Sequence, residues 1–535
     1  MSAVRVCRLI CALAVGWCVL LGSAASQEAL AQNGDGPDAS ANTKAGTSSY
    51  GVSGTVVNSV TGEPVRRALV QVAEQNGPAA VTDNTGHFQL EGLKEGQAFV
   101  SVMKPGFDME TAQTQMVQVG KDAPAVVLKI APAAVIAGRV TTLDEQPLEG
   151  FQIHIISKRV ASGRETWMDI PNQGRTNEDG EYRIPGLSAG TYYVAVEHPQ
   201  TRMSQRGVAN PREEVFAKVF YPGVADLSGA TPLELGPGRE IEADFVVSAE
   251  PLYSVAGEIS APSDVTGLNF TRRVGNDEDF TQFVGAQGGR FEGKVPAGAY
   301  EVSGPSSNGL QMSTPGASVV ISGDNPDVRI AMEPMTNIPV EFSTETGPAG
   351  AERSVRTEND IPGFAISLFS TRSVPGQTNW WTRPTGIMNV TPGVYTLQID
   401  AYTEWWVKSA KRGGIDLLSD DLAVVDGAQA PIEITVRNDG AIVSGTVTPP
   451  GNVGVFVVQQ RGKKNFVKMA MAEQGNFTIA GVPPGDYDVV AIERGEQIEY
   501  MNPEVLNPYL ASAEHISVAR NGRSTVNLNA VPRGK

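Results

Sequence analysis

A chain of 535 residues is too long to fold around one hydrophobic core, so its length predicts several domains. Its hydrophobic content of 41% is that of a folded protein, and its 58 glycines and 35 prolines suit many short strands joined by turns. The net charge of −17 at pH 7 argues against nucleic acid and against an anionic membrane surface as partners.

Residues 1–31 have the features of a secretory signal peptide. Arg5 and Arg8 give the positive start, and the apolar run 9–21 that follows is too short to span a bilayer as a helix. Small residues then allow cleavage after Ala25 or after Ala31, and we favour Ala31. The alternative is an uncleaved N-terminal anchor. We therefore expect an exported protein, periplasmic, outer-membrane-associated or extracellular, with no transmembrane segment in the mature chain.

The three cysteines, Cys7, Cys11 and Cys18, all lie in the predicted signal peptide. The mature chain would then have neither a disulfide framework nor a thiolate metal site. Trp17 is too large for the position before a lipoprotein cysteine, which argues against lipid attachment at Cys18.

Residues 32–49 are rich in Gly, Ser, Asn and Asp without periodicity, which predicts a flexible leader. Regular structure is expected from Tyr50, in a first module at 50–131. This module contains a sequence motif that recurs along the chain. The motif begins with an Asp-x-x-Gly turn at 83–86, which favours a hairpin because Gly accepts the positive φ of a tight turn.

The same order of elements restarts four more times. We expect further modules at 132–249, 250–334, 335–438 and 439–535, of which the fourth is the most diverged. The second module carries an insert at 201–226 in which short helices are an option. No other stretch after the signal peptide has helical periodicity.

Five signature glycines mark the repeat, each three residues after a hydrophobic residue: Gly96, Gly190, Gly298, Gly393 and Gly485. In four copies a tyrosine follows two residues later, at Tyr192, Tyr300, Tyr395 and Tyr487, and Ala98 takes that place in the first copy. A repeat of roughly 100 residues corresponds to one β-sandwich per unit. The period-2 alternation after each glycine places the tyrosine in the core between two sheets, so we prefer a structural role for it over ligand binding.

At these positions the sequence resembles the carboxypeptidase regulatory-like domain family. The shared pattern is an opening G-x-V strand, a turn like T-G-E-P-V, a D-x-x-G-x-F/Y turn, and G-L/V-x-x-G-x-Y. Modules one, two and five match well, module three keeps the two ends of the pattern, and module four keeps little before its last hairpin. The resemblance implies a seven-stranded, transthyretin-like sandwich, related to starch-binding-like and collagen-adhesin B-type domains. The expected fold is thus all-β, a tandem array of about five Ig-like or transthyretin-like β-sandwich domains.

Two pairs of segments outside this pattern resemble recurrent parts of multi-repeat envelope proteins from soil bacteria such as acidobacteria. They are 406–410 with 416–418, and 500–504 with 508–509. The carboxypeptidase of the family name refers to a neighbouring catalytic domain, and nothing in this sequence resembles one.

Motifs for enzyme chemistry are missing from the sequence. The four histidines, His87, His154, His198 and His515, stand in separate contexts and form no zinc-peptidase motif, and there is no G-x-S-x-G nucleophile elbow. Residues 288–294 have P-loop spacing but lack the Ser or Thr that follows the lysine. We predict no catalytic, cofactor-binding or metal-binding residue and no enzyme activity. A surface calcium ion at 83–86 or 177–180 is an alternative that lacks the full ligand set of a calcium loop.

The best candidate for a binding site is aromatic. Module four holds Trp380, Trp381, Tyr402, Trp405 and Trp406. Adjacent residues of a strand point to opposite faces, so each tryptophan pair is expected to bury one ring and expose the other. Trp380, Trp381, Tyr402 and Trp405 would then form a platform for sugar rings or an apolar peptide. The alternative is that Trp406 and one partner fill the core while the others cover the sheet edge.

These observations predict a non-catalytic, exported binding or adhesion protein that contacts polysaccharide or another envelope protein. A structural spacer of the cell envelope without a small ligand is the first alternative. A regulatory subunit of a hydrolase is the second. The sequence leaves the ligand and the oligomeric state open.

Overall fold

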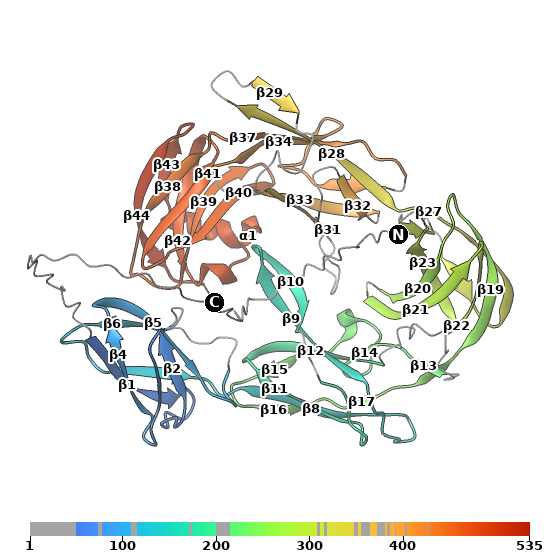
Figure 1. The fold of residues 1–535 in the computed structure, drawn as a ribbon, viewed down its shortest axis with the longest axis horizontal. Coiled ribbons are helices and arrows are strands. Elements are labelled where there is room, and N and C mark those ends of the chain that lie inside the picture. Colours follow the sequence, from blue (N-terminus) through green and yellow to red (C-terminus); the bar gives the residue numbers. More distant parts are fainter. Residues whose placement is uncertain are drawn as a thin grey trace, which may run out of the picture. The chain divides into compact units, whose positions relative to one another are not determined.

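A computed structural model describes most of the chain from Tyr50 onward (Figure 1). The described residues are 50–72, 77–108, 115–170, 174–198, 214–275, 277–307, 311–314, 318–346, 351–354, 364–371, 380–381, 386–390, 392–401, 404–425 and 427–534. The predicted signal peptide, the predicted leader and residues 201–213 of the predicted insert lie outside this part. Strands dominate the described residues, and the predicted all-β fold class is confirmed.

The first module contains seven strands. They are β1 (Tyr50–Asn58), β2 (Leu69–Val72), β3 (Ala79–Val81), β4 (His87–Leu93), β5 (Gly96–Met103), β6 (Gln115–Val119) and β7 (Val126–Ile130). One sheet has the order β4-β1-β7 and the other β3-β2-β5-β6, so the module is a sandwich of two sheets. Its buried cluster, from Val52 to Ile130, lies between these sheets.

The second module follows the same plan, with longer strands only in the hairpin β9–β10. Its elements are β8 (Ala134–Thr141), β9 (Gln152–Ala161), β10 (Arg164–Asp169), β11 (Glu181–Leu187), β12 (Gly190–Glu197), β13 (Glu214–Phe216), β14 (Val219–Phe220), the 3-10 turn η1 (Leu227–Gly229), β15 (Leu233–Leu235), β16 (Glu240–Glu242), β17 (Phe245–Val246) and β18 (Ala249–Pro251). The described end of the insert, from Glu214, forms strands β13 and β14.

The third and fourth modules contain strands β19 to β37. The third has β19 (Tyr253–Ser260), β20 (Gly267–Val274), β21 (Asp277–Gln287), β22 (Arg290–Val295), β23 (Gly298–Pro305), β24 (Gln311–Ser313), β25 (Val319–Ile321), β26 (Asn325–Ala331) and β27 (Glu333–Pro334). The fourth has β28 (Thr336–Thr346), β29 (Ala351–Ser354), β30 (Phe364–Ser370), β31 (Trp380–Trp381), β32 (Gly386–Val390), β33 (Gly393–Ala401), β34 (Trp406–Arg412), β35 (Ile415–Asp416), β36 (Leu422–Val424) and β37 (Ile432–Arg437).

The fifth module adds short helices to its sandwich. Its elements are β38 (Ala441–Thr448), β39 (Val453–Arg461), β40 (Lys464–Met471), β41 (Asn476–Val482), β42 (Gly485–Glu493), η3 (Gly495–Gln497), α1 (Pro503–Leu506), η4 (Asn507–Ser512), β43 (Glu514–Val518) and β44 (Arg523–Val531). Helix α1 is a single turn capped by the Asn502 side chain, which accepts from the Glu504 amide at 3.1 Å. Four residues are too few to show helical periodicity, so no helix is predicted here from the sequence.

All five modules share one strand pairing. The opening strand of each pairs antiparallel with the first strand of the recurring hairpin and parallel with a strand at or near the end of the module. In the first module these are β1 with β4 and β7, and in the diverged fourth they are β28 with β32 and β37. The second, third and fifth modules repeat the arrangement around β8, β19 and β38. This recurrence supports the module boundaries that we propose.

The glycine of the opening strand is explained by this pairing. A Cβ added to Gly54 would lie 2.2 Å from the carbonyl oxygen of Val126, and one added to Gly445 would lie 1.7 Å from that of Val526. Both carbonyls belong to the last strand of the module, which therefore approaches the opening strand too closely for any side chain.

The tyrosines of the repeat hydrogen-bond to the turn of the recurring hairpin from within the core. The hydroxyls of Tyr192, Tyr300 and Tyr487 each donate to the carbonyl oxygen four residues earlier, at 3.0, 2.7 and 2.8 Å. All three side chains are buried, so each hydroxyl satisfies a carbonyl at the turn while its ring fills the core. The structural role predicted for these tyrosines matches this geometry.

Two arginine-centred ion clusters lie where modules adjoin. Arg272 of β20 contacts Glu250 of β18 at 2.7 Å and Asp279 of β21 at 2.9 Å. Arg437, at the end of β37, contacts Asp439 just before β38 at 2.6 Å and also pairs with Glu345. Among the described residues no helix is long and apolar enough to cross a membrane.

Candidate functional site

The most distinctive local feature is the hairpin β9–β10 of the second module. Its turn, Ser162-Gly163, has φ of 49° and 73°, the left-handed pair that a two-residue hairpin turn requires. The corresponding hairpin of the first module, β2–β3, has strands of only four and three residues, whereas β9 and β10 have ten and six. The extra length carries the turn beyond its own sandwich.

The turn contacts the fifth module at Tyr500 and Met501. The Met501 amide donates to the Gly163 carbonyl at 2.9 Å, and a Cβ added to Gly163 would lie 2.4 Å from the Tyr500 ring. Gly163 is buried even though it lies in a hairpin turn. Glycine is thus required here both for its backbone conformation and for the ring packed against it.

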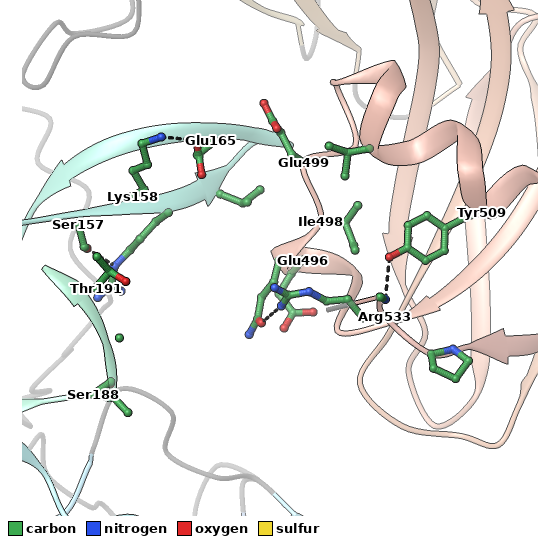
Figure 2. A pocket seen from close by; sticks show the side chains of 18 of the residues that line it. Ser157, Lys158, Glu165, Ser188, Thr191, Glu496, Ile498, Glu499, Tyr509 and Arg533 are labelled. Carbon is green, nitrogen blue, oxygen red and sulfur yellow. Dashed lines mark hydrogen bonds and ion pairs between the residues drawn. The ribbon is translucent and has the colours of Figure 1, made fainter. Parts of the chain in front are cut away.

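A cleft of about 1040 Å³ lies beside this contact, between β9, β12 and the C-terminal part of the fifth module (Figure 2). We call it the hairpin cleft. In Figure 2 Lys158 pairs with Glu165 on the hairpin, at 2.9 Å, and on the opposite wall Arg533 donates to the side-chain oxygen of Gln497, near Glu496. Tyr509 accepts from the Gly534 amide at 2.9 Å. The walls therefore combine charged groups with hydroxyls, and Ile498 adds apolar surface.

A second cleft, of about 970 Å³, lies between the turn of β9–β10, strand β33 and strand β40. We call it the junction cleft. Cations and carboxylates both line it, and Trp406 contributes an aromatic wall. Lys464 pairs with Asp421 at 2.9 Å, and Lys463 lies 3.8 Å from Asp420. These lysines come from the β39–β40 hairpin, so the tips of two hairpins meet the fourth module here.

Burial shifts several pKa values in the junction cleft. It lowers the pKa of Lys468 to about 8, and the attraction of Asp400 opposes it only in part. It raises the pKa of Asp400 above its ordinary range, against the hydrogen bonds from Gln398. It also lowers the pKa of Arg164. Charged groups thus lie in a partly desolvated cavity without full pairing, a combination found at binding sites as well as in structural ion networks.

A half-buried histidine lies between two more exposed carboxylates on the same sheet as the hairpin. His154 Nδ1 is 2.6 Å from Asp169 Oδ2, and its Nε2 is 3.2 Å from Glu197 Oε2, within ion-pair range but outside hydrogen-bond geometry. Burial opposes protonation of His154, but the two carboxylates outweigh burial and raise its pKa. Over the described part of the chain, no group of three or more His, Cys, Asp or Glu side chains is arranged to hold a metal ion.

The predicted aromatic platform is only partly described. Trp380 and Trp381 form β31 at the edge of a sheet, Tyr402 lies outside the described residues, and the platform stays a prediction. Trp405 is half-buried and packs edge-on against Phe364 at 6.2 Å. Trp406 is buried and donates its indole N–H to Asp439 at 2.9 Å.

The residues at the two clefts were missed by sequence reasoning about sites. Ser162-Gly163 between two strand-like runs is a hairpin signal that identifies the turn, but nothing in it indicates contact with residues more than 300 positions away. The segments 406–410 and 500–504 were singled out in the sequence, and Trp406, Tyr500 and Met501 all line the junction cleft.

Residues 51–129 and 135–217 each match the family model of the carboxypeptidase regulatory-like domain. These two segments are carboxypeptidase regulatory-like domains. The resemblance drawn from the opening strand, the Asp-x-x-Gly turn and the signature glycine is confirmed for this part of the chain. The comparison with curated proteins finds no match.

Several solved structures share local similarity with the chain. The Bacillus anthracis TIE protein is 13% identical over 54% of this chain and 51% of its own length, with a TM-score of 0.17. A streptococcal ancillary pilin is 10% identical over 54% of this chain and 99% of its own, with a TM-score of 0.20. A minor pilin of Streptococcus agalactiae is 13% identical over 37% of this chain and 97% of its own, with a TM-score of 0.21. TM-scores at this level establish neither a shared domain arrangement nor a shared function.

Proposed function

We propose that the protein is a non-catalytic, exported, multi-domain binding or adhesion protein that contacts polysaccharide at the cell envelope. The observation that carries the proposal is the pair of clefts beside the β9–β10 hairpin, whose walls mix hydrogen-bonding side chains with aromatic rings. Such walls suit a ligand rich in hydroxyl groups, because sugars offer both donors and an apolar ring face. The signature tyrosines and opening glycines are used for folding, so the clefts are where the modules depart from their repeat.

The test is a glycan array probed with the mature chain. Binding to one class of glycan supports the proposal, and its loss on Trp381→Ala and Trp405→Ala would place the site on the predicted platform of the fourth module. Loss on Lys158→Ala or Arg164→Ala, with binding retained in the tryptophan variants, would place it at the hairpin. Absence of binding to every glycan and to isolated envelope fractions would contradict the proposal.

A structural spacer is the second candidate, favoured by a different observation. The Arg272 and Arg437 clusters and the contact of Gly163 with Tyr500 join modules to one another through buried or half-buried groups. A rigid array of this kind would hold its two ends at a fixed distance without needing a ligand. Small-angle scattering that gives one rigid shape, together with a negative array, would support the spacer.

A further inference from the structure

We propose that the junction cleft binds a sugar residue bearing a single carboxylate, and that Arg164 is the residue that recognises this carboxylate. The inference rests on the proposed function and names the ligand class for one of its clefts. Arg164 is partly buried but has no carboxylate partner among the described residues.

Arg164 is held in place from two sides by the fourth module. Its guanidinium lies over the Phe369 ring, 4.9 Å from the ring centroid, and its Nε donates to Gln398 Oε1 at 3.4 Å. The side chain is only partly exposed. Stacking and the Nε hydrogen bond fix the plane of the guanidinium, which leaves its two terminal nitrogens to meet the cleft.

No described carboxylate forms an ion pair with Arg164 within 4.0 Å, and its terminal nitrogens have no hydrogen-bond acceptor among the described residues. Buried cations in folded proteins are normally paired, because removing a charge from water costs several kcal/mol unless an opposite charge offsets it. Arg164 is therefore positioned to form an ion pair with a carboxylate that comes from a ligand.

The neighbouring carboxylates are engaged elsewhere. Asp421 pairs with Lys464 at 2.9 Å and accepts from Thr396 at 2.9 Å. Both oxygens of Asp400 accept from Gln398 at 3.1 Å. Glu499 accepts from Asn502 at 3.1 Å. None of these carboxylates is within ion-pair distance of Arg164, so its two terminal nitrogens keep their hydrogens for an incoming anion.

Lys468 is a second cation of the cleft without an ion pair among the described residues. Its Nζ donates to the Ala480 and Ala401 carbonyls at 2.7 and 3.3 Å. Its positive charge adds to that of Arg164 on the same cavity, whose volume of about 970 Å³ accommodates one or two sugar rings.

The ligand class follows from three constraints. The guanidinium fork matches a carboxylate with two parallel hydrogen bonds, better than an ammonium does. Each cleft carboxylate keeps further lone pairs beyond the hydrogen bonds that it already accepts, and these suit sugar hydroxyls. The net charge of −17 repels polymers of high negative charge, so an isolated carboxylate on an otherwise neutral glycan fits better than a polyanion.

The test compares methyl β-glucuronide with methyl β-glucoside, which differ only in a carboxylate against a hydroxymethyl group. Ligand-observed NMR titration of the full mature chain is expected to give at least tenfold tighter binding of the glucuronide. Arg164→Gln is expected to abolish that preference, and Arg164→Lys, which keeps the charge but not the fork, to reduce it severalfold. Arg183→Gln is the matched control: Arg183 lies in the same module but is exposed and pairs with Glu240 on the surface.

Equal binding of the two sugars would overturn the inference while leaving glycan binding in place. A glucuronide preference that persists in Arg164→Gln would also overturn it, by assigning the carboxylate to another residue. No binding of the glucuronide contradicts it as well, and the glycan array then decides separately whether the proposed function stands. Hydrogen exchange of β9 and β10 confirms that each variant keeps the hairpin folded.

Discussion

Trp406 and Asp439 join the fourth module to the fifth through one hydrogen bond. The indole Nε1–H of Trp406 donates to Asp439 Oδ1 over 2.9 Å, and both residues are buried. The same carboxylate accepts from Arg437 Nε at 3.0 Å. Because Asp439 stands between β37 and β38, it fixes the direction in which the chain enters the last sandwich. The Arg437 guanidinium holds the pKa of Asp439 below its ordinary value, with Trp406 adding to the effect against burial.

Asp439→Ala is expected to destabilise this junction by about 3–5 kcal/mol, because it removes a buried carboxylate that pairs with the buried Arg437 guanidinium. Hydrogen exchange should show faster opening of β34, β37 and β38 than in wild type. Asp327→Ala removes an exposed partner of Arg329 and serves as the control with no measurable change. Unchanged exchange at β37 in Asp439→Ala would contradict the role given to this carboxylate.

Tyr487→Phe is expected to weaken the last hairpin by about 1 kcal/mol. The substitution keeps the ring in the core but removes the hydroxyl that donates to the Pro483 carbonyl at 2.8 Å, so that a buried carbonyl loses its donor. The measurement is the exchange rate of amides in β41 and β42. Tyr300→Phe should show the same effect in β22 and β23 and leave the fifth module unchanged, since the two sites share no contacts.

Gly163→Ala is expected to release the β9–β10 turn from the fifth module. The new methyl would overlap the Tyr500 ring in addition to straining a φ of 73°. Gly150→Ala is the matched control, because Gly150 has a φ of 80° in the same module but open space around its Cβ position. Limited proteolysis should cut the turn at 162–163 in Gly163→Ala and spare it in Gly150→Ala. Equal resistance in both variants would mean that the contact with Tyr500 does not hold the turn.

Lys468→Met is expected to stabilise the junction at neutral pH. With a pKa of about 8 in the folded chain and 10.5 when unfolded, the unfolded state holds more protons between these values. Stability should therefore rise with pH across that window, and the penalty below pH 8 is on the order of 3 kcal/mol. Denaturant midpoints at pH 7, 9 and 10.5 should show this slope in wild type and a flatter profile in Lys468→Met. Lys463→Met, at an exposed position, is expected to keep the wild-type slope.

His154→Gln is expected to remove a pH dependence of the opposite sign. The folded pKa of His154 is raised above 6.5, so its stabilising contribution is fully present below pH 6.5 and is lost as the pH rises through the folded value. Asp169 and Glu197 supply the attraction, and Lys218 opposes it. Unfolding of the second module at pH 5.5 and 8.5 should show wild type losing stability with rising pH relative to His154→Gln. Parallel profiles would contradict the charged histidine.

The sequence alone determined the fold class and the repeat, because both depend on patterns of residues that are close together in the chain. Period-2 alternation identifies the strands, the signature glycine and the tyrosine after it close each hairpin from within one short segment, and the opening glycine marks where two strands approach most closely. The same local reading extends to the diverged fourth module, whose Gly393 and Tyr395 were enough to place its last hairpin on β33.

Only the tertiary structure decided the candidate site, because its members come from distant parts of the chain. Arg164 meets Gln398 across 234 positions, and Gly163 meets Tyr500 across more than 300. Such contacts depend on the length of a hairpin and on how one sandwich packs against another, and neither leaves a periodic trace in the sequence. The partial burial of Lys468 and the lack of a carboxylate partner for Arg164 among the described residues are likewise properties of the assembled junction, since desolvation and ion pairing follow from what surrounds a side chain in space.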